Sequence, residues 1–60
     1  MAHDRRYEAL VSARTREEAI EIASEALPRG MHVTHAEAED VALREGKDSW
    51  QVTLWFAPTA

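Results

Sequence analysis

Trp55 and Gln51, near the C-terminus, have the side chains best suited to binding a flat aromatic ligand. They lie four residues apart within residues 50–56, so on an extended strand they point to the same face. An indole stacks on flat rings, and an amide offers a ring edge one donor and one acceptor. The alternative is that Trp55 packs against another copy of the chain and Gln51 hydrogen-bonds within that interface.

A second group of side chains could in principle bind a cation. His35, Glu37 and Glu39 alternate along the chain, and an imidazole with two carboxylates is a suitable ligand set for a divalent metal. On a strand, however, successive members lie roughly 7 Å apart, too far for one ion without help from a neighbouring strand or chain. A polar stripe facing solvent is the simpler interpretation. His32 and His3 have no nearby partner in sequence and are interpreted as surface residues.

Catalytic motifs are missing from the sequence. It offers no Ser-His-Asp order, glycine-rich phosphate loop or paired-histidine zinc spacing, and it holds only two glycines. We therefore expect that the protein is not an enzyme, although a site shared between subunits stays open.

Composition narrows the class of protein further. Sixty residues form one small domain, residues 1–60, whose core is barely large enough to fold alone. Without cysteine there is no disulfide or thiolate metal site, which fits a cytoplasmic location. Small domains of this kind are commonly stabilised by homo-oligomerisation. The net charge of −4 argues against nucleic acid, and no signal peptide or membrane span is recognisable.

The sequence predicts the order β-α-β-β, an α+β fold with a three-stranded antiparallel sheet under one helix. Alternation over residues 6–13 predicts a first strand, and residues 50–56 the last strand. Thr15 and Glu18 form a capping box, opening a helix over residues 16–27 that stops at Pro28 and Gly30. Its acidic face is interpreted as solvated. The predicted core comprises Val11, Ile20, Ala23, Leu27, Val52 and Leu54.

The stretch of residues 31–45 is ambiguous. Its Ala, Glu and Leu content also suits a helix capped at Thr34. Because three strands under one helix make a better small core than two, we predict a long strand, with a bulge near Asp40. Residues 44–49 then form the hairpin turn, with Gly46 supplying any positive φ. Met31, Val33, Val41 and Leu43 would share one register with His35, Glu37 and Glu39.

The order of elements and three segments resemble the dodecins, small β-α-β-β flavin-binding proteins that assemble as hollow dodecamers. Residues 50–56 are similar to that family's aromatic-Gln-Val-Thr-Leu strand, and residues 15–27 correspond to its helix. His35-Ala36-Glu37 falls where the family has a tryptophan followed closely by a glutamate. The resemblance implies that a flavin, FMN or riboflavin, is bound between subunits. Gln51 would contact the isoalloxazine edge, and His35 stands in place of the sandwiching tryptophan.

A second family, the small N-terminal domain of Jag-type RNA-associated proteins, shares the order of elements. Residues 15–20 look like its helix start, but its basic, glycine-containing loop is absent. We therefore expect a non-enzymatic, dodecin-like oligomer that binds or sequesters a small flat ligand between subunits. The alternative is a structural or regulatory assembly module that works through protein partners without a small ligand.

Overall fold

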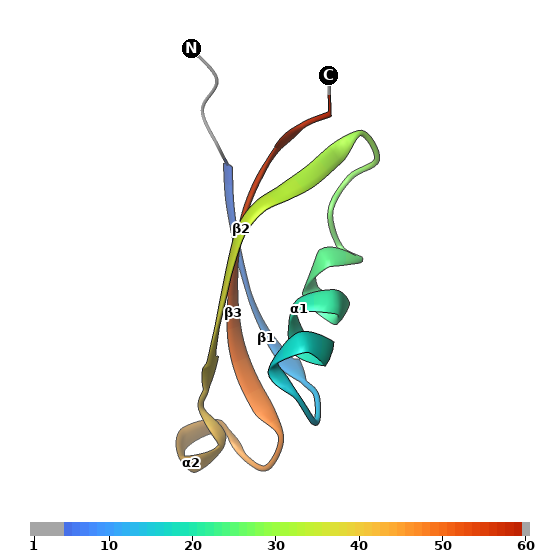
Figure 1. Ribbon diagram of the computed structural model, residues 1–60. Coiled ribbons are helices and arrows are strands. Elements are labelled where there is room, and N and C mark those ends of the chain that lie inside the picture. The colour runs from blue at the N-terminus through green and yellow to red at the C-terminus, as the bar shows by residue number, and fades with distance from the viewer. Residues whose placement is uncertain (1–4, 60) are drawn as a thin grey trace.

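The computed structural model describes residues 5–59, which form a three-stranded antiparallel sheet with the main helix on one face (Figure 1). The predicted fold class is confirmed. The elements, in chain order, are β1 (Arg5–Ser12), α1 (Arg16–Ser24), β2 (Met31–Asp40), α2 (Ala42–Glu45) and β3 (Ser49–Pro58).

The strand richest in large apolar residues, β3, lies in the middle of the sheet. The strand order is β1-β3-β2, and both neighbours run antiparallel to β3. The sequence alone left open which strand β1 would join. Pairing with β3 places Val52 and Leu54 between two strands and beneath the helix, where neither has measurable exposure. Pro58 ends the strand, as expected of a residue that cannot donate to a ladder.

Helix α1 begins as predicted and ends earlier. The Glu18 amide donates to Thr15 Oγ1 at 3.1 Å. The Glu18 carboxylate accepts from the Arg14 amide at 2.8 Å, one residue before the Thr15 amide that a capping box would use. The helix ends at Ser24, not at Leu27. After Ser24 the backbone tightens, with the Ala26 amide donating to the Ala23 carbonyl and the Leu27 amide to the Ser24 carbonyl, each at 3.1 Å. The residue before a proline disfavours the helical conformation, which agrees with an end before Leu27.

Strand β2 begins at Met31 as predicted, but its bulge lies elsewhere. Its bulge lies at Thr34, between the pairs Val33–Phe56 and His35–Trp55, and not near Asp40. One extra residue reverses the alternation. The apolar Met31 and Val33 therefore share the helix side with Ala36 and Ala38, while His35, Glu37 and Glu39 point the other way.

The hairpin between β2 and β3 contains a short helix, where the prediction had a strand running on to a simple turn. The strand stops at Asp40, whose carboxylate accepts from the Ala42 amide at 3.0 Å. Val41 is buried, but Leu43 on α2 is fully exposed and does not continue the strand register. Gly46 has a positive φ of 107°, as expected, and Asp48 adopts the left-handed region at 61°.

The core is small and rich in alanine. Ala13, Ala19 and Ala23 join Val52 and Leu54 in one buried cluster. The predicted core residues Val11, Ile20 and Leu27 pack against it but stay partly exposed, because a nine-residue helix cannot cover strands of eight to ten residues. Trp50 also packs there, and its indole N–H donates to the Ala13 carbonyl at 3.0 Å.

Candidate functional site

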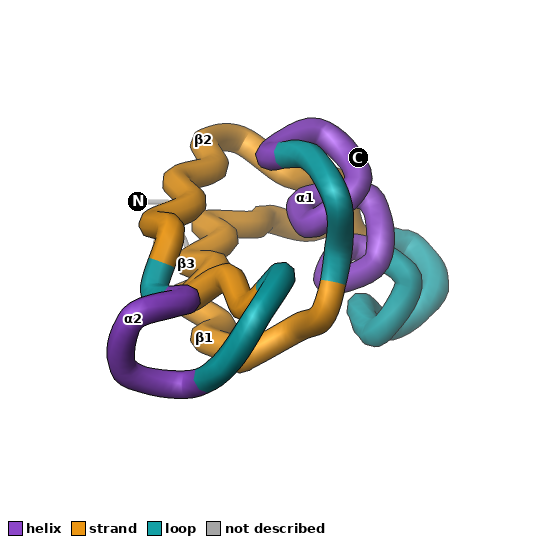
Figure 2. Tube along the Cα trace, turned by 90° about the horizontal axis from the view of Figure 1, so that it is seen from below, coloured by secondary structure: helices purple, strands orange, loops and turns teal. Residues whose placement is uncertain are grey.

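The candidate site is the sheet face opposite α1, called here the open face. Figure 2 shows α1 on one side of the sheet and the short α2 on the other. The strand registers arrange the open face in three rows across β1, β3 and β2. The rows are Arg6–Trp55–His35, Glu8–Thr53–Glu37 and Leu10–Gln51–Glu39.

Trp55 and His35 form an aromatic pair in the first row. Their ring centroids lie 5.0 Å apart at an interplanar angle of 47°, within the range of favourable tilted contacts. His35 Nε2 also lies 3.2 Å from Glu37 Oε2. The contact holds His35 against the indole, while Trp55 as a whole stays partly exposed.

Gln51 lies on the same face but in a different row. Four residues along β3 correspond to about 13 Å, with Thr53 between Gln51 and Trp55. Of the three predicted ligand-binding residues, the structure therefore brings His35 and Trp55 together and leaves Gln51 apart. A small ligand stacked on Trp55 would not reach Gln51 of the same chain.

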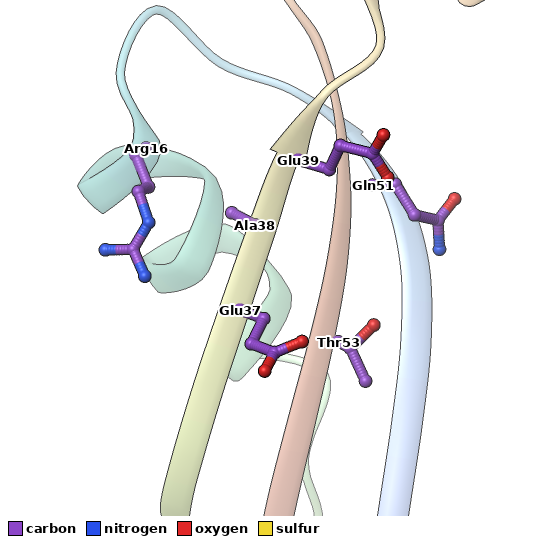
Figure 3. A pocket seen from close by; sticks show the side chains of 6 residues that line it. All are labelled: Arg16, Glu37, Ala38, Glu39, Gln51 and Thr53. Atoms are coloured by element: carbon purple, nitrogen blue, oxygen red, sulfur yellow. The ribbon is translucent and has the colours of Figure 1, made fainter.

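A hollow of about 360 Å³ follows the outer side of β2, lined by Arg16, Glu37, Ala38, Glu39, Gln51 and Thr53. Figure 3 shows that Arg16 and Ala38 lie on the helix side of β2, while the other four side chains lie over the open face. The hollow thus includes Gln51 but not Trp55. Its lining is mostly polar, and two of its members are carboxylates.

The open face is acidic. Glu8, Glu37 and Glu39 outnumber the single cation Arg6, whose Nε lies 3.5 Å from Glu8 Oε2. Within residues 5–59, no group of three His, Asp or Glu side chains is placed to hold a metal ion, and His35 pairs with Glu37 and Trp55 instead. His32 Nδ1 lies 3.3 Å from Thr59 Oγ1, whereas His3 lies outside the described residues.

Two exposed leucines on this side were not recognised as part of a site. Leu10 is 53% exposed in the same row as Gln51, and Leu43 lies on α2, which projects on the open-face side (Figure 2). The alternation of β1 already assigned Leu10 to the second face. The helix-forming residues 42–45 were the signal that Leu43 would leave the strand.

Comparisons with protein-family models, with curated proteins and with solved structures found no match for this chain. None of the helices within residues 5–59 has the length and apolar character needed to cross a membrane. Any assignment of function therefore rests on the geometry of the open face.

Proposed function

We propose that this protein is a non-enzymatic, cytoplasmic homo-oligomer that binds or sequesters a small flat ligand, such as a flavin, between the open faces of its subunits. The observation that carries the proposal is the partly exposed Trp55, held by His35 on the sheet face that α1 does not cover. A large aromatic side chain in this position is suited to stacking and is unusual on a purely solvated face.

The separation of Gln51 from Trp55 supports binding between subunits. When two open faces meet about a two-fold axis that passes near Thr53, Trp55 of one copy lies opposite Gln51 of the other. Directly packed sheets lie about 10 Å apart with their side chains interdigitated, so a flat ring between the open faces would hold the two sheets farther apart. The indole would then stack on the ligand, and the amide of the other subunit would bind its edge. This arrangement agrees with the dodecin resemblance.

The charge of the open face favours a neutral flavin. At about 10 Å, two unit charges in water repel by about 0.4 kcal/mol, and physiological salt reduces this to about a third. The phosphate of FMN carries close to two negative charges, and a ligand between two subunits meets a net −2 on each open face. The repulsion sums to about 1 kcal/mol, or about a fivefold preference for riboflavin over FMN.

The two tryptophans make a direct test possible. Trp50 lies on the helix side, where its indole is bonded to Ala13, so Trp55 should be the indole that is quenched. We expect riboflavin to quench the tryptophan fluorescence of Trp50→Phe, in which Trp55 is the remaining indole. The tryptophan fluorescence of Trp55→Phe should stay unchanged. Gln51→Ala should weaken binding without abolishing quenching. If wild-type fluorescence and flavin absorbance both stay constant up to high micromolar riboflavin, and the purified protein carries no small molecule, ligand binding is refuted.

The second candidate, an assembly module without a small ligand, is favoured by a different observation. Leu10 and Leu43 are exposed on the same side as Trp55, and a contact between subunits would bury all three. In that case the protein would assemble fully with no ligand present, and riboflavin would not change its sedimentation.

A further inference from the structure

The outer edge of β1 carries a row of backbone groups that no strand within residues 5–59 pairs. Ala13 N–H donates to the Asp48 carbonyl at 2.8 Å, and these residues continue the β1–β3 register. In an antiparallel ladder, bonded and non-bonded positions alternate. The odd-numbered residues of β1 therefore bond to β3, and the even-numbered residues direct their N–H and C=O groups outward.

The two edges of the sheet differ in how well they resist pairing. Edge strands are usually protected by bulges, prolines or charges. The β2 edge has a bulge at Thr34 and three acids, Glu37, Glu39 and Asp40, which would meet their own copies. By contrast, β1 is regular over eight residues, has no proline, and carries charges of both signs.

We propose that two copies of the chain pair along β1, antiparallel and edge to edge, so that their sheets join into one continuous sheet. A two-fold axis perpendicular to the sheet matches the outward groups of one copy with those of the other. Such pairing forms about eight backbone hydrogen bonds if four residues of each copy take part. These residues are Arg6, Glu8, Leu10 and Ser12.

The side chains select the register. Centring the pair on Glu8 sets two carboxylates directly opposite each other, which is unfavourable. Centring it on Leu10 shortens the overlap and sets Arg6 opposite Arg14 of the other copy. Centring it on Ala9 pairs residues 6–12 of both copies and places Glu8 opposite Leu10. No like charges then face each other directly.

This register also completes the apolar layer beneath the helix. Tyr7, Ala9 and Val11 point to the helix side and are only partly buried. In the Ala9-centred pair, Tyr7 of each copy lies opposite Val11 of the other and Ala9 opposite Ala9. Aromatic and β-branched cross-strand pairs of this kind stabilise a sheet. The joined edge would therefore bury side chains that one copy leaves half exposed.

A single cysteine tests the register, because the natural chain has none. Ala9 and its counterpart form a non-hydrogen-bonded pair with Cα atoms roughly 4.5 Å apart, within the range that a disulfide spans. We expect Ala9→Cys to convert most of the protein to a covalent dimer under mild oxidation, with Ala38→Cys on the β2 edge as the matched control. Absence of the Ala9→Cys dimer, or equal crosslinking of both variants, overturns the proposal.

A proline variant tests the backbone bonds. The Glu8 amide points outward, so Glu8→Pro removes backbone bonds between copies and none within the chain, and edge strands tolerate proline at such positions. Glu8→Ala, which also loses the contact with Arg6, is the matched control. We expect Glu8→Pro to lose the dimer that Glu8→Ala retains, with unchanged secondary structure by circular dichroism. A Glu8→Pro dimer as stable as the wild type refutes the pairing. If Glu8→Pro fails to fold, the crosslink at Ala9 decides.

The outcome is separable from that of the flavin titration. Edge pairing needs no ligand and does not involve Trp55. Thr53→Cys, near the axis between open faces, reports the other interface. Facing sheets about 10 Å apart are beyond the reach of a direct disulfide, so a bifunctional thiol reagent of that span is used. Crosslinking at Thr53 without crosslinking at Ala9 would refute edge pairing and leave the proposed function intact.

Discussion

Truncating Leu54 should show how strongly the free energy of unfolding depends on the small core. Leu54 has no measurable exposure and lies on the central strand, opposite Tyr7 and Ala36. Leu54→Ala removes three carbons, worth about 2.4 kcal/mol in transfer free energy. The alanines of the buried cluster cannot extend into the space left behind, so a cavity penalty adds to this. We expect a loss of about 3–4 kcal/mol in the free energy of unfolding.

That loss is large compared with the total free energy of unfolding. A domain of this length is typically stable by about 3–9 kcal/mol, so at the lower end of this range Leu54→Ala would be close to unfolded at room temperature. Val52→Ala removes two carbons from a neighbouring buried position and should cost about 2 kcal/mol. Urea unfolding followed by tryptophan fluorescence measures both variants, at equal protein concentration because assembly shifts apparent stability.

Leu43→Ala is the matched control. Leu43 is fully exposed in the single chain, and surface substitutions usually change stability by less than about 0.5 kcal/mol. A loss below about 1 kcal/mol for Leu54→Ala would refute the placement of the core between β3 and α1. A concentration-dependent loss for Leu43→Ala would instead show that another copy covers α2.

Two further predictions concern the cap of α1 and the open face. Thr15→Ala removes the side-chain acceptor of the Glu18 amide and should lower the free energy of unfolding by about 1 kcal/mol. Glu18→Gln keeps an oxygen for the Arg14 amide and should lower it less. Equal losses for the two variants in urea unfolding would contradict the capping argument. Trp55→Ser should weaken assembly more than Glu21→Ser on the exposed side of α1, as measured by sedimentation at micromolar concentration. A wild-type protein that stays monomeric would refute the assembly itself.

Much of this fold could be predicted because local signals agreed with one another. The Thr15–Glu18 capping pattern fixed the start of α1, and the alternation of β3 separated a core face from a face bearing Trp55 and Gln51. The end of α1 could have been placed more accurately by noting that Leu27, directly before Pro28, disfavours the helical conformation.

The course of β2 could not be predicted from alternation, because a bulge changes which residues share a face. Val33 and His35 have the same parity in sequence, yet the extra residue at Thr34 puts them on opposite faces. The same bulge sets His35 beside Trp55. Sequence could therefore place His35, Gln51 and Trp55 on strands, and the rise per residue already separates Gln51 from Trp55. The position of His35 beside Trp55 depends on a cross-strand register that no local pattern encodes.

The open face and the β1 edge together suggest how the assembly closes. Edge pairing uses a two-fold axis perpendicular to the sheet, and open-face packing uses one within the plane between two sheets. Two such axes that intersect at right angles close at four copies, with the α1 helices outside and the Trp55 rows inside. Strands in a sheet twist by about 20–25° relative to their neighbours, and this twist can tilt the two axes away from a right angle. A smaller angle between the axes would instead give a larger closed shell. The mass of the intact oligomer therefore measures the angle between the two interfaces. Glu8→Pro should leave open-face pairs and Trp55→Ser should leave β1-edge pairs, if each interface forms independently of the other.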